Sequence, residues 1–432
     1  MKIKNKRSFP MKRYDLAVVG GGFAGFAAAV SAAREGASVI LIEKGNALGG
    51  AAVNNLVNPF MPYFTTIDGK KYDLSRGIFT EVRTKLKEYR DKATAVTSLG
   101  EISFLEEDLK YILNETAIEA GVDLLFHAYL FGVNKTGEKI ESVKFATVMG
   151  EVTVEADYFI DATGDAQLSF LAGCPTKLGR EPDSLCQPMT LCFRVGNADV
   201  DRFFKSHKRL NEEYAKAQAT GEITNPRHNV LVFKTPVKNV LHFNTTRVVK
   251  KNPTNPMEVT EAEIIARRQV YEIYEFMKKH ADGLEDSFLM MTASEIGVRE
   301  SRMIEGDYTL TEKECKDCVK FADGIAACNY DIDIHNPEGS GTSHYYFGPG
   351  EYYTIPYRCL IPRGVENMLV AGRCISSDHG AQASYRIMPT VTTIGEAAGT
   401  AIALAKKAGA TTREVDVEEL RRALTKNGAL VD

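Results

Sequence analysis

The chain has 432 residues, which is long for a single hydrophobic core and therefore favours two structural domains. Hydrophobic residues make up 44% and charged residues 25%, an ordinary balance for a folded globular protein that gives no case for disorder. The formal net charge of -4 comes from nearly equal numbers of acids and bases, so nucleic-acid binding gains no support. No apolar stretch approaches the roughly 18 to 20 residues that span a bilayer, and we expect no membrane span.

Residues 1–10 are expected to form a flexible extension that carries a short basic run. The apolar run Leu16 to Val19 behind it could imitate a secretory signal, but Gly20 to Gly22 interrupts that run after four residues. We therefore expect a cytoplasmic protein. Its eight cysteines are scattered along the chain, and at this size reduced thiols are the default interpretation.

The first part of the chain predicts a βαβ unit followed by further helices, a third parallel strand and a β-meander. The meander turns at Met149-Gly150 and returns to the main sheet through 159–162. The expected strands are 14–19, 38–42, 122–133 and short pieces within 139–158, and the expected helices are 25–35, 78–89 and 106–120.

The character of the sequence changes after about residue 186, where aromatic-rich strands, loops and one long charged helix, 260–280, follow. We expect a separate substrate-facing domain there, over 186–354. A strand at 367–371 and a helix at 389–408 then return to the first domain, which is predicted to be discontinuous and to comprise 11–185 and 355–432.

The motif Gly20-x-Gly22-x-x-Gly25 follows a predicted strand and opens a predicted helix, which is the context that a dinucleotide-binding fingerprint requires. Gly20 makes the tight turn, Gly22 lets a pyrophosphate approach the backbone, and Gly25 lets the helix press on the sheet. The start of the helix supplies free N–H groups and partial positive charge.

Glu43 follows the second strand, 23 residues after Gly20, where its carboxylate can accept hydrogen bonds from both hydroxyls of an adenosine ribose. The alternative is a glycine turn in an α/β domain that binds nothing, which the spacing, the context and Glu43 together disfavour. FAD and NAD both remain open at this point.

Three further motifs decide for FAD: Gly45-Asn46-Ala47-Leu48-Gly49-Gly50, Ala162-Thr163-Gly164-Asp165, and Leu369-Val370-Ala371-Gly372-Arg373. Together they resemble the glutathione-reductase-type flavoproteins, in the branch related to the flavoprotein subunits of fumarate reductase and succinate dehydrogenase. The chain is most similar to the FAD-dependent oxidoreductase family that also contains heterodisulfide reductase-like flavoproteins. More specific marks are the segments 297–302, 333–335, 355–362 and 384–389.

The resemblance implies an α/β fold, with a Rossmann-type FAD-binding domain that has a parallel sheet and a β-meander, plus a second α+β substrate or cap domain. It also implies that the helix beginning near Pro389 points its positive end at the pyrimidine edge of the flavin. Where relatives often offer an acidic residue to the ribitol, this chain has Gly372-Arg373. The residues expected to bind FAD are Gly20, Gly22, Phe23, Ala24, Gly25, Glu43, Lys44, Gly49, Gly50, Ala51, Leu130, Ala162, Thr163, Gly164, Asp165, Gly372, Arg373, Met388 and Pro389.

Arginines gather in the segments that follow the long helix and return to the flavin. Such a set favours the binding of a carboxylate or oxyanion, because a guanidinium pairs with it through two hydrogen bonds. For Arg299, Glu300 and Arg302 an Arg–Glu network between the domains is an equal alternative, whereas Arg358 and Arg386 favour a site role.

His335 and His344 flank a turn-rich stretch just before the chain returns to the cofactor domain. A loop there can carry an acid or base over the flavin. We therefore expect one of these histidines to act as the base, with Arg358 and Arg386 holding the substrate and Tyr357 as a further hydrogen-bond donor.

The pair Cys315-x-x-Cys318 has a spacing that suits both a redox disulfide and a zinc site. Zinc needs two more ligands, and only Cys328 is close in sequence. Thiol exchange usually needs NADPH at a second nucleotide fingerprint, which the sequence does not contain. A surface loop is the favoured interpretation, and no metal site is predicted.

Two functions remain open. The favoured one is an FAD-dependent oxidoreductase that passes a hydride between flavin N5 and a small organic substrate, oxygenated or carboxylated. The alternative is an electron-relay subunit that hands electrons to an iron–sulfur redox partner protein, as in heterodisulfide reductase-like relatives.

Overall fold

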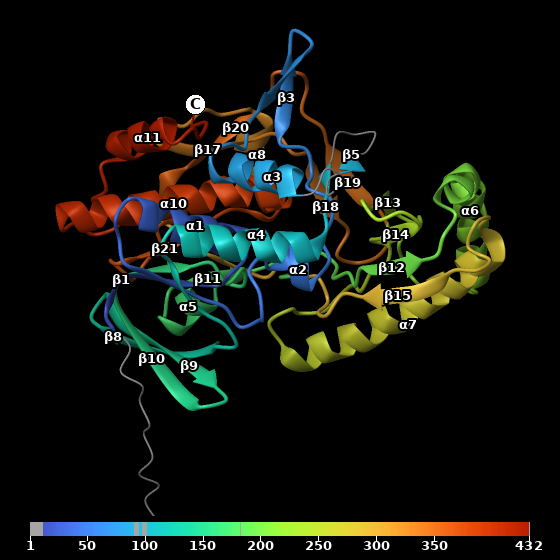
Figure 1. Cartoon of the computed structure of the whole chain (residues 1–432), viewed down its shortest axis with the longest axis horizontal. Helices are drawn as coiled ribbons and strands as arrows, with labels where there is room; N and C mark the ends of the chain where they lie inside the picture. The colour runs from blue at the N-terminus through green and yellow to red at the C-terminus, as the bar shows by residue number, and fades with distance from the viewer. Residues whose placement is uncertain (1–11, 90–94, 97–101, 182, 432) are drawn as a thin grey trace, which may run out of the picture.

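The computed structural model describes residues 12–89, 95–96, 102–181 and 183–431. The extension expected at 1–10 lies outside these residues. In Figure 1 the main sheet and helices α1 (Phe23–Arg34), α4 (Glu106–Glu119) and α10 (Met388–Ala408) occupy one end of the molecule, and the helices of the second region occupy the other.

The main sheet is built around β1 (Tyr14–Val19), which pairs in parallel with β2 (Val39–Ile42) on one side and β10 (Gly150–Asp161) on the other. Parallel pairing continues outward to β7 (Asp123–Leu125) beside β2 and to β21 (Met368–Val370) beside β10. This arrangement confirms the predicted βαβ unit, and β10 both closes the meander and re-enters the parallel sheet.

The apolar run at 122–133 is not one strand, as the sequence led us to expect. It divides into the parallel strand β7 and the meander strand β8 (Tyr129–Thr136), which pairs antiparallel with β9 (Lys139–Thr147). His127 between them has a φ of 55°, a left-handed backbone that breaks a strand, and its N–H donates to the Gly45 carbonyl. The apolar composition carries no signal of this turn.

Helices α1 and α10 cross at very short range because α10 has glycines where it meets α1. A Cβ atom at Gly395 would lie 2.1 Å from the Ala24 carbonyl oxygen, and one at Gly399 would lie 2.0 Å from that of Ala28. The Ser31 hydroxyl also donates to the Glu396 carbonyl across the crossing, at 3.0 Å. Side chains larger than hydrogen at these two positions would force the helices apart.

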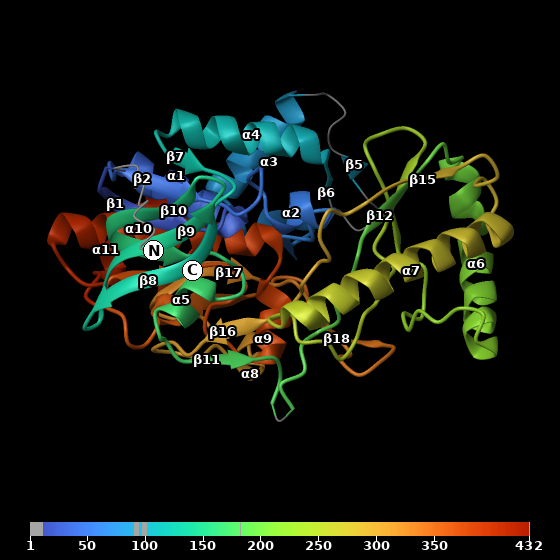
Figure 2. The ribbon, with the colours of Figure 1, turned by 90° about the horizontal axis from the view of Figure 1, so that it is seen from below.

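The second region is an antiparallel sheet with two long helices, which Figure 2 shows at the end remote from the main sheet. Its strand order is β13 (Val232–Lys234), β14 (Val240–Phe243), β12 (Phe193–Gly196) and β15 (Phe288–Thr292). The sequence predicted only one long helix here. The structure has α7 (Pro256–His280) and also α6 (Val200–Thr220), whose start is capped by the Asp199 carboxylate.

The other elements are short and connect these layers. The helices are α2 (Ala51–Asn54), α3 (Ile78–Tyr89), α5 (Gln167–Leu171), α8 (Glu312–Lys316), the 3-10 turn η1 (Tyr357–Leu360), α9 (His379–Tyr385) and α11 (Val417–Lys426). The strands are β3 (Phe64–Ile67), β4 (Lys70–Asp73), β5 (Ala95–Val96), β6 (Ile102–Ser103), β11 (Thr176–Leu178), β16 (Arg302–Ile304), β17 (Gly324–Cys328), β18 (Ile332–His335), β19 (Thr342–Tyr345) and β20 (Tyr353–Pro356).

Three hydrophobic cores are found among the described residues. The smallest lies against the other face of the main sheet, beside the meander and α5. The two larger ones correspond to the two regions. One lies between the main sheet and helices α1, α4 and α10, and it includes buried side chains of the segment 304–353. The other lies between β12, β14, α6 and α7. The proposed domain boundaries, 186 and 355, stay predictions.

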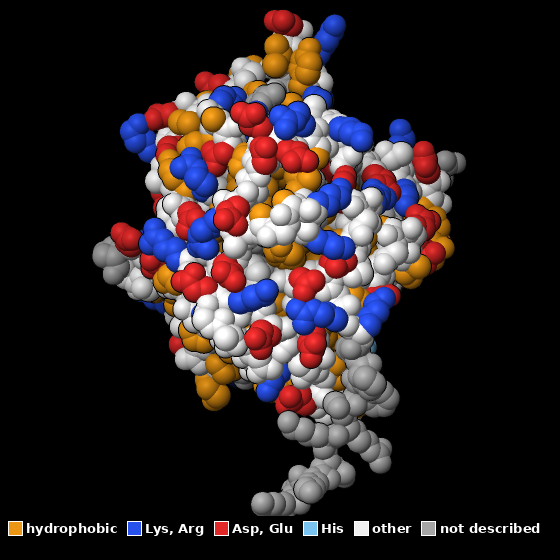
Figure 3. Space-filling view, turned by 90° about the vertical axis from the view of Figure 1, so that its left-hand side faces the viewer, with side chains coloured by type: hydrophobic (Ala, Val, Ile, Leu, Met, Phe, Trp, Pro, Cys, Tyr) orange, Lys and Arg blue, Asp and Glu red, His pale blue; other side chains and the backbone are white. Residues whose placement is uncertain are grey.

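The described part of the chain has no single helix that is both long and apolar enough to cross a membrane. Helices α9 and α10, which meet at a bend of 96°, satisfy the length and composition requirement only as a pair. On the face shown in Figure 3, side chains of both charges are interspersed, and neither charge forms a continuous patch there.

Candidate functional site

The turn after β1 has the geometry of a dinucleotide-binding loop. Gly20 has a φ of 106° and its N–H donates to the Ile42 carbonyl, which ties the turn to β2. A Cβ at Gly25 would lie 1.8 Å from the Gly20 carbonyl oxygen, so a side chain there is incompatible with the contact between helix and turn. Phe23 and Ala24, in the first turn of α1, are buried. Gly20 and Gly25 are therefore required by the backbone conformation and packing of the protein, whether or not a ligand binds.

Gly22 differs, because the space beside it is open. A Cβ at Gly22 would have no neighbour nearer than Gly50 Cα, at 4.0 Å. Gly22 is also the N-cap of α1, where no side chain accepts the free N–H groups of the first turn. Open space at an uncapped helix start fits a pyrophosphate that takes those hydrogen bonds.

Glu43 has a structural task beyond the predicted ribose contact. It is buried, and its two carboxylate oxygens accept from the N–H groups of Gly21 at 2.6 Å and Gly45 at 2.7 Å. Glu43 thus fixes the glycine turn against the next loop, and the ribose contact stays a prediction. Lys44, half-exposed, pairs with Glu295 at 3.4 Å.

The other predicted FAD segments meet the glycine turn. The Gly49 N–H donates to the Gly21 carbonyl at 2.8 Å, and Gly49, Gly50 and Ala51 form the start of α2. Two further segments reach the strand and helix that flank the turn: the Ala162 N–H donates to the Val19 carbonyl, and a Cβ at Gly372 would lie 3.4 Å from Ala24 Cβ. The Leu130 carbonyl accepts from Gln167, outside the predicted segments.

Asp165 and Arg373, both among the residues predicted to bind FAD, form an ion pair with each other. Arg373 Nη2 lies 2.8 Å from Asp165 Oδ1, and the Ser301 hydroxyl donates to the same oxygen at 2.6 Å. Burial alone would raise the pKa of Asp165, but Arg373 and Ser301 lower it below the usual value. Arg373 Nε is buried and has no hydrogen-bond partner among the described residues. Thr163 and Gly164 complete this turn, and the Thr163 N–H donates to Asp161.

Met388 and Pro389 begin α10, and no side chain caps this helix start either. From there the helix runs on to Gly395, where it crosses α1. Seven residues of α-helix span about 10 Å, so the start of α10 lies on the order of 10 Å from this crossing. The uncapped start fits the predicted approach of its positive end to a flavin.

A second group of predicted residues meets around the buried carboxylate of Asp333. His335 Nε2 lies 3.2 Å from Asp333 Oδ2, His344 Nε2 lies 3.7 Å from Oδ1, and Arg386 Nη2 lies 3.7 Å from Oδ2. Burial alone would raise the pKa of Asp333, but His335 and Arg386 hold it well below its usual range. Three of the five predicted catalytic residues are therefore together.

The two histidines of this group have different environments. His335 is 7% exposed, and its Nδ1 accepts from Arg247 at 2.9 Å, so both ring nitrogens have partners. Burial, and next Arg299, lowers the pKa of His335 far below its usual value. His344 is less buried, with Nδ1 2.6 Å from Asp331 and its ring stacked on Tyr346. Of the two, His344 has the geometry of an accessible base.

Tyr357 and Arg358 have other partners. The Tyr357 hydroxyl is buried and donates to the Thr412 carbonyl at 2.8 Å. Arg358 Nε donates to Asp323 at 2.8 Å, and its guanidinium lies over the Tyr308 ring. Neither residue shares a partner with the group around Asp333, so the structure does not bring these two predicted residues into it.

Two arginines that the sequence analysis did not single out, Arg227 and Arg247, belong to loops that meet near the same group. Arg247 donates to His335 at 2.9 Å, and Asn225, two residues before Arg227, donates to the Thr245 carbonyl, two residues before Arg247, at 3.0 Å. Burial, and next Arg386, lowers the pKa of Arg299 to about 9, while burial, and next Arg227, lowers that of Arg247 to about 10. Arg227 and Arg247 lie in loops of the second region, far in sequence from Arg386. Nothing in their local sequence marks them, since they belong to no motif.

The Arg–Glu network considered as the alternative for Arg299, Glu300 and Arg302 does not form among the described residues. Glu300 instead pairs with His379 at 2.8 Å and accepts from the Gln187 N–H. Arg299 donates to the Pro188 carbonyl and the Thr190 hydroxyl, and Arg302 lies over the Phe170 ring. Arg299 therefore faces the group around Asp333 without a carboxylate of its own.

The surface-loop interpretation of Cys315 and Cys318 is wrong for Cys315. Cys315 lies in α8 and is fully buried, and burial raises the pKa of its thiol. Cys318 is partly exposed, and both thiols are free. The helix, with its Thr311–Glu314 capping box, removes Cys315 from the surface.

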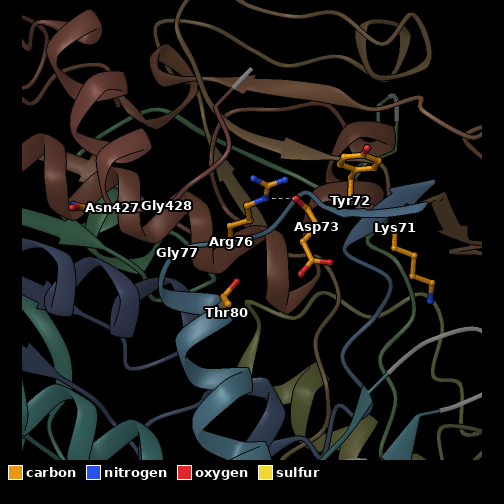
Figure 4. A pocket seen from close by; sticks show the side chains of 8 residues that line it. All are labelled: Lys71, Tyr72, Asp73, Arg76, Gly77, Thr80, Asn427 and Gly428. Carbon is orange, nitrogen blue, oxygen red and sulfur yellow. Dashed lines mark hydrogen bonds between the residues drawn. The ribbon is translucent and has the colours of Figure 1, made fainter. Parts of the chain in front are cut away.

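Two pockets lie apart from these groups. The first has a volume of about 530 Å³ and is shown in Figure 4. It is lined by residues of β4, by the start of α3 and by Asn427. Arg76, which lines it, donates to the Asp73 carbonyl. The second, of about 460 Å³, lies along α7. Neither is lined by a predicted site residue.

Comparison with known proteins gives similar solved structures at low identity. No curated protein matches the chain. Among solved structures, the chain is similar to a geranylgeranyl bacteriochlorophyll reductase-like protein from Thermoplasma acidophilum. The two are 15% identical, the match covers 96% of this chain and 84% of that one, and the TM-score is 0.49. It is also similar to L-proline dehydrogenase from P. horikoshii, with 11% identity, coverage of 98% and 100%, and a TM-score of 0.47.

A profile of the family described as FAD dependent oxidoreductase matches residues 15–424, nearly the whole chain. The match spans both groups of residues, from the glycine turn after β1 to α11. Because the open space at Gly22 and the uncapped helix starts also fit the cofactor, FAD is the cofactor of this oxidoreductase. The chain belongs to the FAD dependent oxidoreductase family.

Proposed function

We propose that this enzyme passes a hydride between a small oxygenated or carboxylated organic substrate and N5 of FAD. The observation that carries the proposal is the cationic group around Asp333, which adjoins the start of α10 because Arg386 precedes Met388 by two residues. When bound, FAD supplies a carrier that accepts or returns two electrons as a hydride.

The residues of this group bind the substrate, transfer the proton and position one another. Arg299 and Arg386 hold the substrate oxygen, since a guanidinium binds an oxyanion through charge-assisted hydrogen bonds. His344, oriented by Asp331 through its Nδ1, takes or gives the proton at Nε2. His335, held between Arg247 and Asp333, positions those two groups.

We further propose that FAD binds as in the glutathione-reductase-type flavoproteins, with the adenosine at Glu43 and the pyrophosphate at Gly22. The meeting of the segments at 20–25, 43–51, 162–165 and 372–373 supports this binding mode. The start of α10 then faces the pyrimidine edge of the flavin, where its positive end stabilises the anion of the reduced ring.

Anaerobic reduction of the FAD-loaded protein tests the function. We expect one of a panel of hydroxy acids, polyols and amines to remove the visible absorbance of the oxidised flavin, and NADPH to do so poorly. The sequence has a single glycine fingerprint between strand and helix, and FAD uses it. If no organic donor reduces the flavin and electrons reach it only from an iron–sulfur partner, the relay alternative replaces the proposal.

A further inference from the structure

We infer that the substrate carries two anionic groups and that Arg227, Arg247, Arg299 and Arg386 bind them together. The inference rests on the proposed function and names the substrate class of that site. The four residues form what we call the arginine cluster. Two of them, Arg227 and Arg247, come from the second region, and Arg386 comes from the turn before α10.

The cluster holds more positive charge than the chain neutralises. Burial lowers the pKa values of Arg227, Arg247 and Arg299, and Asp333 is the carboxylate whose negative charge acts to raise them. Among the described residues it is also the one carboxylate that forms an ion pair with a cluster arginine, Arg386. Asp333 also accepts from His335, so its single charge is shared. Buried charge without a partner is costly, and four guanidiniums against the one carboxylate of Asp333 leave three positive charges, more than a single further carboxylate can balance.

Other acidic groups near the cluster are already engaged. Asp331 is paired with His344 at 2.6 Å, and Glu300 is paired with His379 and with the Gln187 N–H. Glu338, near the loop that contacts Arg247, pairs with Arg180 at 2.9 Å. None of these carboxylates forms an ion pair with a cluster arginine among the described residues.

Several donors of the cluster have no hydrogen-bond partner. Arg227 donates from Nε to Asn229 at 3.1 Å, but within the described chain neither of its terminal nitrogens makes a hydrogen bond. Arg386 donates from Nε to Ala383 and from Nη2 to the Asp333 carbonyl, which leaves Nη1 unused by the described residues. Free donors on two arginines can bind two separate oxyanions.

Arg247 and Arg299 are held in place instead. Arg247 is 2% exposed and donates to the carbonyls of Gly339 and Gly341 and to His335. Arg299 donates to Pro188 and Thr190. These neutral partners fix the positions of the two guanidiniums and leave their charge in place, which suits a site that is preorganised for an anion.

The phosphates of FAD do not supply the missing charge. We place the phosphates at Gly22, next to Gly50. Among the described residues, no side chain of the arginine cluster makes a hydrogen bond to the glycine turn. The Arg299 side chain donates to Pro188, Thr190 and Asn244, which lie outside the glycine turn. An anion that balances the cluster is therefore a second ligand.

Matched anions test the inference on the FAD-loaded protein without turnover. Succinate and methylenediphosphonate carry two anionic groups, and acetate and methylphosphonate carry one. Titration of the flavin spectrum and the shift in Tm report binding. We expect the two-group member of one pair to bind at least about tenfold more tightly than its one-group counterpart, and the pair that responds distinguishes a carboxylate from a phosphate substrate. Equal binding within both pairs, or no binding by any probe, overturns the inference.

Single substitutions locate the site. Arg227→Gln should weaken binding of the two-group probe at least about tenfold while FAD content stays at the parent level, because its terminal nitrogens serve no other described residue. Arg358→Gln is the matched control and should leave probe binding unchanged, since Arg358 pairs with Asp323 elsewhere. Arg227→Lys keeps the charge and covers the case in which Arg227→Gln fails to fold. If Arg227→Gln folds, parent-like probe binding in that variant refutes the site. If only Arg227→Lys folds, the loss of the paired guanidinium donors should still weaken binding, and parent-like binding there refutes the site.

Failure of this inference and failure of the proposed function give different results. A protein whose flavin is reduced by a neutral alcohol but which binds no two-group probe keeps the proposed function and refutes the anion site. A protein that binds succinate through Arg227, but whose flavin no organic donor reduces, keeps the anion site and refutes the hydride-transfer proposal.

Discussion

The FAD cradle and the arginine cluster are built in opposite ways. The cradle, which comprises the segments 20–25, 43–51, 162–165 and 372–373, is made largely of backbone and small residues, such as the glycines of the turn after β1. The cluster is made of long charged side chains from four segments that are separated by tens of residues, from Arg227 to Arg386. One region is tightly packed around small residues, and the other is buried and cationic.

The difference shows what each ligand requires of a protein. A dinucleotide offers a pyrophosphate that any row of free N–H groups can bind, so a short glycine motif at a helix start suffices. A small substrate must be held on several sides at once, so its binding residues converge from separate elements. The cradle is therefore specified locally, and the cluster depends on the whole fold.

The largest effect is expected from a single substitution in the FAD cradle. Gly22→Val places a side chain in the open space where we propose that the pyrophosphate binds, and should weaken FAD binding at least about a thousandfold, about 4 kcal/mol, with little change in the fold. FAD content after gel filtration and the circular dichroism spectrum of the protein measure the two quantities. Stoichiometric FAD in this variant would refute the assigned phosphate contact.

Gly25→Val is the contrasting variant three residues away. Its Cβ would lie 1.8 Å from the Gly20 carbonyl, so we expect loss of the folded protein and not only of the cofactor. If both variants fold and both keep FAD, the two glycines do not have the separate tasks that the structure assigns to them.

The next effect concerns the cluster. Arg299→Ala and Arg386→Ala should keep FAD but slow flavin reduction by the organic substrate at least about a hundredfold, near 2.7 kcal/mol, because each removes a charged donor from the substrate. Stopped-flow absorbance measures the rate. Arg358→Ala, whose ion pair with Asp323 is about half-exposed, should reduce within about twofold of the parent. An equal loss of rate in all three would contradict the separation of Arg358 from the cluster.

The sequence predicted which segments meet around the glycine turn because each of their signals is local, and their contacts with FAD stay predictions. Spacing and context identified the glycine turn, and the strand that follows α1 placed Glu43. The cluster was predicted only in part: Arg386, His335 and His344 lay in segments with a family resemblance, whereas Arg227 and Arg247 lie in loops that carry no motif. Their convergence depends on how β18 and β19 pair and on the packing of the second region, which single-sequence patterns do not encode.

Helix α6 was missed for a related reason, although its sequence did carry a signal. Phe203, Leu210 and Tyr214 are buried at helical spacing, and Asp199 caps the start. The many charged residues between them resemble a loop when they are considered one by one. A count of apolar positions at intervals of three and four would have found this helix.

The cluster and the FAD-binding region also differ in how they hold buried charge. The cluster keeps its charge for a ligand, whereas the FAD-binding region hides an acid, Glu396, in the middle of α10. Glu396 is 2% exposed and accepts from the Ile78 N–H at 3.0 Å. Burial raises its pKa to about 7, although the Ile78 hydrogen bond and Arg34 act in the other direction.

A folded-state pKa above the unfolded value means that the fold favours the protonated acid. The corresponding stability is complete below the unfolded pKa of 4.5 and is lost as the pH rises through 7. Between about pH 5 and about pH 8 the parent should lose about 2 kcal/mol of unfolding free energy through this group. Glu396→Gln, which keeps an acceptor for Ile78 without a titrating proton, should remove that loss. Denaturant unfolding at both pH values measures it, and an unchanged pH dependence in the variant would show that Glu396 stays ionised in the fold.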